Sequence, residues 1–262
     1  MKQYKGYLID LDGTMYKGSE PIDAASAFVQ ALKESQIPHL FVTNNSSRKP
    51  EQIADKLQTF HIPAEKEQIF TTSMATASYI SDQTSQARVF AIGEEGLHSA
   101  LEQEGHLLTE EYCDYVVIGI DRDITYEKLA TACLQVRNGA AFLSTNSDVA
   151  IPTERGMLPG NGSLTSVITI STGVQPIFIG KPEPIIMEQA MEQIGLTKDE
   201  VLMVGDNYHT DIMAGIKAGF DTLHVQTGVT QKEHLSHFDE QPTYSIKTLE
   251  EWTSFLYNMK GE

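Results

Sequence analysis

Two aspartates separated by one residue, Asp10 and Asp12 in the string YLIDLDGTMY, carry the clearest chemical signal in the chain. They follow an apolar run at residues 7–9 that is typical of a buried strand, and Gly13 ends the strand pattern. Because side chains alternate along a strand, we expect both carboxylates to converge at its carboxyl end. Two like charges at that distance need a cation or a shared proton, and hard oxygen ligands favour Mg²⁺. A solvated turn is the alternative, since Asp and Gly are ordinary turn residues.

A second polar string follows the next predicted strand, at residues 39–43. Thr43, Asn44 and Asn45 supply a hydroxyl, two amides and backbone N–H groups, which suit phosphate oxygens. A following helix would add its positive end to such a site. Helix capping is the alternative interpretation, because Thr, Asn and Ser do this routinely.

Two further strings place charged residues after apolar runs late in the chain. Lys181, in IFIGKPEP, would bring an ammonium to the charge of a phosphoryl group. Asp206, in VLMVGDNYHTD, would complete a Mg²⁺ site, with Asn207 and Asp211 orienting the ligands or Lys181. Each residue has a simpler interpretation, such as an exposed lysine or a carboxylate at a helix start. Ligands bind at the carboxyl edge of open α/β sheets, so we expect all these strings to meet there.

The elements that must position these residues alternate between strands and helices almost from end to end. This pattern predicts parallel sheets covered on both faces by helices. Because one compact sheet rarely needs so many strands at 262 residues, we predict two α/β units. Residues 1–78 and 179–262 would form the core, and residues 79–178 an inserted α/β domain. The strands are expected at residues 7–9, 39–43, 69–71, 88–92, 115–120, 141–144, 177–179, 201–204 and 222–225, with a helix opening at Pro21 among those between them.

The composition of the chain limits the kinds of partner that the protein can bind. The chain has 19 Lys and Arg against 36 Asp and Glu, a formal net charge of -17, which repels nucleic acid and anionic membranes. The first residues do not have the pattern of a signal peptide, and no run of 18 apolar residues suggests a membrane span. We therefore expect a cytoplasmic protein that binds neither nucleic acid nor a membrane. The oligomeric state stays open, with a homo-oligomer among the alternatives.

The four strings together resemble the haloacid dehalogenase-like superfamily. DLDGT at 10–14, VTNNS at 42–46, Lys181 in GKP and GDNYHTD at 205–211 look like its four motifs, in the same order. The long gap between the second and third motifs is similar to the subfamily with a large α/β cap. TNSDVAIPTERGMLPGNGSL at 145–164 resembles the NagD-type, or p-nitrophenyl phosphatase, branch. The resemblance implies a Rossmann-like parallel sheet with an inserted cap.

The resemblance also implies a reaction, the hydrolysis of a phosphomonoester. Asp10 would attack phosphorus and form an aspartyl phosphate, and Asp12 would act as general acid and base. Mg²⁺ would be held by Asp10, the backbone carbonyl of Asp12, and Asp206. Thr43, Asn44, Asn45 and Lys181 would hold the phosphoryl oxygens.

Substrate choice is expected to lie with the inserted domain. Asn146, Asp148 and Arg155 are candidates for residues that read the leaving group, with a plain polar loop as the alternative. Asp148→Ala would then alter the ranking of substrates more than the hydrolysis of a small aryl phosphate. The substrate is expected to be a small phosphorylated metabolite such as a sugar phosphate. A phosphotransferase or mutase with the same nucleophile, and a non-catalytic regulator that binds a phosphometabolite, are the alternative functions.

Overall fold

The computed structural model describes residues 2–153 and 155–258. The chain folds into two compact units. Unit 1 comprises residues 1–43, 51–70 and 181–262, and unit 2 comprises residues 44–50 and 71–180. The sequence placed residues 44–50 and 71–78 with the core. Residues 71–78 belong to unit 2 because helix α3 (Thr72–Gln83) buries Ala77 and Ile80 against Leu97 and Leu101 of helix α4 (Glu95–Gln103). Residues 44–50 contact the same helix, since the carbonyl of Ser47 accepts from the backbone N–H of Gly96. Residues 179–180, also predicted as core, belong to unit 2 as well.

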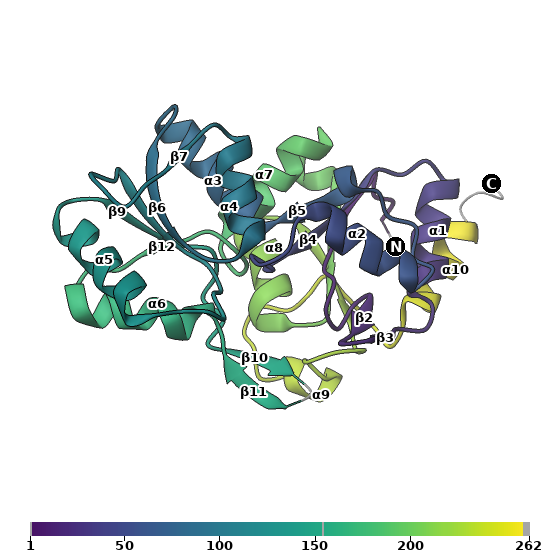
Figure 1. Cartoon of the computed structure of the whole chain (residues 1–262). Coiled ribbons are helices and arrows are strands. Elements are labelled where there is room, and N and C mark those ends of the chain that lie inside the picture. The colour runs from purple at the N-terminus through teal and green to yellow at the C-terminus, as the bar shows by residue number, and fades with distance from the viewer. Residues whose placement is uncertain (1, 154, 259–262) are drawn as a thin grey trace. The chain divides into compact units, whose positions relative to one another are not determined.

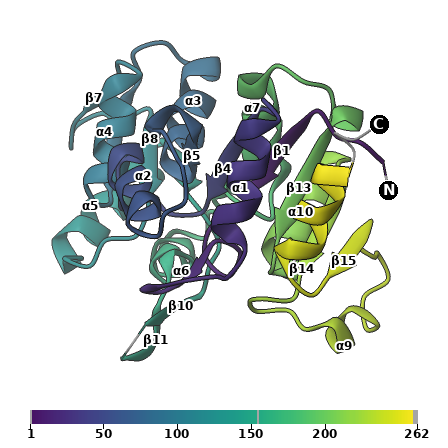
Figure 2. The same cartoon turned by 90° about the vertical axis from the view of Figure 1, so that its right-hand side faces the viewer.

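Unit 1 is built on a parallel sheet, of which Figure 1 labels β4 and β5. In this sheet β1 (Gly6–Ile9) has a parallel neighbour on each side, β13 and β4, and Figure 2 labels all three. Alternation explains how β1 fills both faces of this sheet: Tyr7 and Ile9 join the main apolar cluster, while Leu8 is buried apart from it. The strands in spatial order are β15 (Tyr244–Ile246), β14 (Asp221–Val225), β13 (Val201–Gly205), β1 (Gly6–Ile9), β4 (His39–Thr43) and β5 (Ile69–Thr71).

Helices cover this sheet. Helices α1 and α10 lie side by side (Figure 2), and the main cluster takes Phe28 from α1 and Trp252 from α10. Helix α8 packs close to Met203 of β13, at Gly215. The helices of unit 1 are α1 (Ala25–Glu34), α2 (Pro50–Thr59), α7 (Pro184–Ile194), α8 (Met213–Ala218), α9 (Lys232–Leu235) and α10 (Leu249–Asn258). Shorter elements are the 3-10 helices Lys66–Gln68 and Lys198–Glu200, the π-helix Tyr208–Ile212, and the hairpin of β2 (Tyr16–Lys17) and β3 (Glu20–Pro21).

Unit 2 has its own parallel sheet and a separate antiparallel hairpin. Its sheet runs in the order β12 (Ile177–Phe178), β9 (Ala141–Ser144), β8 (Tyr115–Ile118), β6 (Arg88–Ile92) and β7 (Leu107–Leu108). The hairpin pairs β10 (Ala150–Thr153) with β11 (Gly156–Pro159). The remaining helices are α5 (Tyr126–Arg137) and α6 (Asn161–Thr172), which pack against each other.

The α/β class with parallel sheets is confirmed, and one local prediction is corrected. The helix expected to open at Pro21 begins at Ala25, because residues 20–21 pair as β3 in the small hairpin. The strand predicted at residues 177–179 is β12, which pairs with β9 in the sheet of unit 2.

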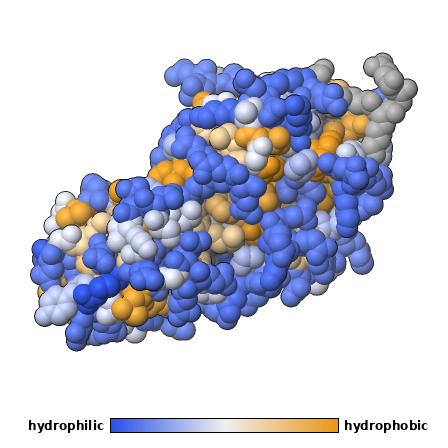
Figure 3. Space-filling view, turned by 90° about the horizontal axis from the view of Figure 1, so that it is seen from above, coloured by the Kyte–Doolittle hydropathy of each residue, from blue (hydrophilic) through white to orange (hydrophobic). Residues whose placement is uncertain are grey.

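One face of the surface is mainly hydrophilic. On the face drawn in Figure 3, hydrophilic side chains predominate and apolar ones form small separate patches. Among the described residues, no helix has the length and apolar character that a membrane crossing requires.

Candidate active site

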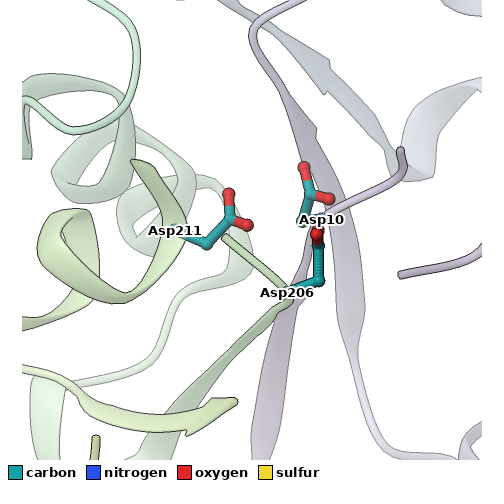
Figure 4. Close-up of side chains that lie close together, drawn as sticks. All are labelled: Asp10, Asp206 and Asp211. Carbon is teal, nitrogen blue, oxygen red and sulfur yellow. The ribbon is translucent and has the colours of Figure 1, made fainter. Parts of the chain in front are cut away.

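Three buried carboxylates meet at the carboxyl edge of the unit 1 sheet. Asp10 follows β1, Asp206 follows β13, and Asp211 lies in the π-helix that comes next. One carboxylate oxygen of each lies within 4.8 Å of the others, and Figure 4 shows the three side chains gathered at this point. Because β1 and β13 are parallel neighbours, their ends deliver Asp10 and Asp206 to the same place.

A buried ammonium lies among these carboxylates. Lys181 is 2% exposed, and its Nζ donates hydrogen bonds to Oδ1 of Asp10 at 2.6 Å and Oδ1 of Asp211 at 2.7 Å. A third bond, of 2.9 Å, reaches the backbone carbonyl of Val42 in β4. Lys181 therefore ties the edge of β4 to the ends of β1 and β13.

The charges of this group do not balance. Three carboxylates share one ammonium, and burial penalises each ionised form. Burial, together with the nearby carboxylate of Asp211, raises the pKa of Asp10 well above its ordinary value, although Lys181 works in the opposite direction. The same two causes raise the pKa of Asp206 to about 7. For Lys181, burial opposes the charge, but the carboxylates of Asp10 and Asp211 outweigh it and raise the pKa.

This arrangement fits a hard divalent cation. A bound cation would offset the excess negative charge that otherwise raises the pKa of the carboxylates, and oxygen ligands suit Mg²⁺ or Ca²⁺. Two glycines leave the room that Asp206 needs. A Cβ at Gly13, whose φ is +94°, would lie 2.4 Å from Oδ2 of Asp206, and a Cβ at Gly228 would lie 1.8 Å from the same atom.

Asp12 differs from the sequence-based expectation. Its side chain is exposed, whereas that of Asp10 is buried, and the acidic cluster found among the described residues does not include it. The alternation argument extended the strand too far: β1 ends at Ile9, and Asp12 pairs with Tyr16 in an isolated bridge. Partial burial raises the pKa of Asp12, while the ammonium of Lys56 lowers it.

The residues after β4 fall into two environments. Thr43 is buried at the end of β4 in unit 1, whereas Asn44 and Asn45 are half-buried in unit 2. The side chain of Asn45 accepts hydrogen bonds from the backbone N–H groups of Ser47 and Arg48, at 3.0 and 2.9 Å. These bonds form a local turn and do not cap a helix, because the next helix, α2, begins at Pro50.

The candidates in unit 2 lie in two places. Nδ2 of Asn146 donates to the backbone carbonyl of Asn44 at 2.9 Å, and the carboxylate of Asp148 accepts from Nδ2 of Asn44. Arg155 is exposed at the tip of the β10–β11 hairpin, where its backbone N–H bonds to Thr153. Asn207, in unit 1, begins the π-helix, and its backbone N–H donates to Oδ2 of Asp211 at 3.0 Å.

Two groups that bond to the buried carboxylates were not identified from the sequence. The buried hydroxyl of Thr14 lies between Oδ2 of Asp10, at 3.2 Å, and Oδ1 of Asp206, at 3.4 Å. The backbone N–H of Val229 donates to Oδ2 of Asp206 at 2.5 Å. Val229 lies in the loop after β14. The strand predicted at residues 222–225 could have indicated this loop, because the carboxyl end of that strand lies at the same edge of the sheet as Asp10 and Asp206.

Comparison with known proteins identifies the class. A model of haloacid dehalogenase-like hydrolases matches residues 7–106, and a second model of HAD-hydrolase-like proteins matches residues 178–252. The chain is 63% identical over 256 residues to the 5'-nucleotidase YutF of Bacillus subtilis, covering 98% of this chain and 100% of that protein. It is 58% identical over 252 residues to an acid sugar phosphatase of Staphylococcus aureus, covering 96% and 97% of the two chains.

Solved structures agree with this result. A thermostable NPPase double mutant from Geobacillus stearothermophilus has a TM-score of 0.91 at 58% identity, over 96% of this chain and 99% of that one. A p-nitrophenyl phosphatase from Archaeoglobus fulgidus also reaches 0.91, at 32% identity over 97% and 100%. The chain belongs to the haloacid dehalogenase-like hydrolases. Within that family it falls in the p-nitrophenyl phosphatase branch, whose reaction class is phosphomonoester hydrolysis.

Proposed function

We propose that the chain is a Mg²⁺-dependent phosphatase that hydrolyses small phosphomonoesters through an aspartyl phosphate on Asp10. The observation that carries this proposal is the buried carboxylate of Asp10, bonded to Lys181 and grouped with Asp206 and Asp211. A binding protein needs neither a nucleophile nor a proton donor beside it. The regulator alternative therefore leaves Asp10 and Asp12 without a purpose.

The nucleophile in this proposal is one particular oxygen of Asp10. Its Oδ1 accepts the 2.6 Å bond from Lys181, whereas Oδ2 accepts the longer bond of 3.2 Å from Thr14. We assign the attack on phosphorus to Oδ2, because the stronger bond withdraws more electron density from Oδ1. Lys181 then favours the ionised form of Asp10 and orients it, and its positive charge acts on the phosphoryl group.

Asp12 is the proposed general acid and base. Its exposed side chain can reach a leaving group, and its raised pKa keeps a larger share protonated than an ordinary aspartate has. Asp12 would protonate the leaving alcohol and afterwards take a proton from the water that hydrolyses the aspartyl phosphate. The lowering effect of Lys56 keeps the base form accessible for that second step.

Asp10, Asp206 and the backbone carbonyl of Asp12 are the proposed metal ligands, with Asp211 completing the acidic cluster. When bound, Mg²⁺ supplies positive charge that offsets the repulsion between these carboxylates and the phosphoryl group. The hydroxyl of Thr43 and the backbone N–H groups after it are the proposed donors to the phosphoryl oxygens. Asn45 contributes through its turn, which orients the segment.

A sugar phosphate remains the proposed substrate class. The named relatives include a 5'-nucleotidase and acid sugar phosphatases, and both names describe esters of phosphate with a sugar hydroxyl. We therefore expect the preferred ester to carry a sugar next to phosphorus, free or within a nucleotide. A phosphotransferase or mutase would use the same nucleophile but deliver the phosphoryl group to an acceptor other than water.

Two measurements test the function. The first is kcat/KM on a panel of sugar phosphates, nucleoside 5'-monophosphates and p-nitrophenyl phosphate, with free phosphate as the readout. The second repeats the panel with Asp10→Asn, which keeps the side-chain volume but removes the anionic nucleophile. We expect hydrolysis by the wild type and a complete loss in the folded variant. Release of phosphate by Asp10→Asn at the wild-type rate would reject Asp10 as nucleophile.

A further inference from the structure

Two residues of one loop in unit 2 hold Asn44. The carboxylate of Asp148 accepts from Nδ2 of Asn44 at 3.2 Å to one oxygen and 3.5 Å to the other. Nδ2 of Asn146 donates to the backbone carbonyl of Asn44 at 2.9 Å. The backbone N–H of Asp148 donates to Oδ1 of Asn146 at 3.1 Å, so the two side chains support each other. Asn44 is therefore held through its side chain and through its backbone.

The loop that carries these residues is itself braced by the start of α6. Asn161 is 1% exposed, and its Nδ2 donates to Oγ of Ser144 and to the backbone carbonyl of Asn146, both at 2.9 Å. Gly160 lies so close that a Cβ there would be 2.2 Å from the carbonyl oxygen of Asp148. A loop packed this closely offers Asn44 a fixed partner.

The other side of the Asn44 amide rests against Gly180. A Cβ at Gly180 would lie 2.6 Å from Oδ1 of Asn44, so the amide oxygen occupies the space that a larger residue would fill. An ionised carboxylate only accepts hydrogen bonds, so Asp148 requires the NH₂ group on its side. The direction of the amide is thus determined from both sides.

We propose that Asp148 is a positioning residue, whose contact with Asn44 fixes the peptide that follows Thr43 and so aims the N–H groups that receive the phosphoryl oxygens. The inference rests on the proposed function, because it needs a phosphoryl group bound after β4. Asn44 is one peptide bond from Thr43, so a turn of the Asn44 backbone turns those N–H groups directly. Asp148 acts on the substrate through Asn44.

This assignment differs from a role in reading the leaving group, and the difference can be measured. A residue that contacts the leaving group affects each substrate to its own extent. A residue that aims the phosphate-binding peptide affects every phosphomonoester by the same factor, since the phosphoryl group is common to all. It also weakens the binding of inorganic phosphate, which has no leaving group.

The experiment is a double-mutant cycle on the full chain with Mg²⁺, using Asp148→Ala, Asn44→Ala and the double variant. The readouts are kcat/KM for p-nitrophenyl phosphate and for ribose 5-phosphate, and the inhibition constant of inorganic phosphate. Val149→Ala is the matched control, because its side chain is 72% exposed in the same loop and its backbone hydrogen bonds do not depend on the side chain. Thermal unfolding checks that every variant is folded.

We expect Asp148→Ala to lower kcat/KM by roughly 10- to 100-fold on both esters, because the variant loses one hydrogen bond to a charged group. The double variant should be no worse than Asn44→Ala alone, because the two residues act as one unit. Asp148→Asn, which keeps an oxygen acceptor, should retain more activity than Asp148→Ala, and Val149→Ala should match the wild type. A larger loss on ribose 5-phosphate than on the aryl ester, or additive losses in the cycle, would overturn the inference. Hydrolysis of neither ester by the wild type would instead contradict the proposed function.

Discussion

Nζ of Lys181 lies 2.6 Å from Oδ1 of Asp10, although 171 positions separate the two residues in the chain. Both residues belong to unit 1, in which Lys181 is the first residue of the last segment and Asp10 follows strand β1. A lysine this deeply buried is costly unless it is paired. Its position therefore indicates that the site needs a fixed positive charge beside the carboxylate of Asp10.

Removal of that charge should destabilise the protein. Lys181→Met keeps the length of the side chain but leaves Asp10 and Asp211 without their ammonium, and breaking a buried pair in this way costs about 3–5 kcal/mol. Urea unfolding without metal measures the loss. Lys217→Met is the matched control, since Lys217 pairs with Glu183 at the surface and such pairs contribute at most about 1 kcal/mol. Equal losses for the two variants would mean that Lys181 stabilises no more than an ordinary surface lysine.

Asp12→Asn should separate substrates by their leaving groups. An amide cannot donate an acidic proton to an alcohol, so the hydrolysis of ribose 5-phosphate should fall by about 100-fold or more. Formation of the phosphoenzyme from p-nitrophenyl phosphate should change little, because p-nitrophenolate leaves without a proton. Rapid-mixing absorbance records this step directly. If both esters lost the same factor in that step, Asp12 would not be the general acid.

Mg²⁺ binding should strengthen as the pH rises through neutrality. In the metal-free protein, the pKa of Asp206 is raised to about 7 from an ordinary value of 3.8, so the folded state holds a proton that the unfolded state has released. The raised pKa of Asp206 therefore adds to the free energy of unfolding. This contribution is complete below pH 3.8 and is lost as the pH rises through 7. Mg²⁺ must displace this proton and any proton held by Asp10, whose pKa is also raised, so the affinity should rise by at least about tenfold per pH unit below pH 7.

Calorimetry with MgCl₂ between pH 5.5 and 8.5 measures this dependence, and chelator should abolish turnover at each pH until Mg²⁺ is restored. A constant affinity across that range would separate Asp206 from the metal site. Full turnover in a rigorously metal-free sample would reject the requirement for Mg²⁺.

A single added methyl group tests whether Asp206 needs the space that Gly228 leaves beside it. Gly228→Ala would bring a Cβ within 1.8 Å of Oδ2 of Asp206, so the carboxylate must move and Mg²⁺ affinity should fall by about tenfold or more. Val229→Ala is the matched control: its side chain is 64% exposed, and it keeps the backbone N–H that donates to Asp206. Unchanged Mg²⁺ binding in Gly228→Ala would place the metal away from Asp206.

Local patterns predicted the strands, because apolar runs such as residues 201–204 are bounded by turn residues and buried on both faces. They also brought Asp10 and Asp206 to one edge, since both follow parallel strands. The order of the strands within each sheet depends on long-range pairing, which local patterns do not describe.

Turns limited the prediction of the site in a similar way. The direction of Asp12 depends on how the chain bends after Ile9, and the strand pattern could not describe that bend. The backbone N–H of Val229 carries no side-chain signal, so only its place after a strand could have indicated it. The boundary at residue 71 depends on the apolar side chains that Ala77 and Ile80 pack against, and these contacts are long-range in the sequence.

The transfer of phosphate to Asp10 is tested most directly by trapping the phosphoenzyme. Asp12→Asn is mixed with excess p-nitrophenyl phosphate and Mg²⁺, quenched within the first turnover and reduced with borohydride, which converts an aspartyl phosphate to homoserine. We predict a burst of about one p-nitrophenolate per active site and homoserine at position 10 in the peptide mass spectrum. The double variant Asp10→Asn/Asp12→Asn should give neither signal. A burst with Asp10 unmodified, or homoserine at another position, would contradict the account.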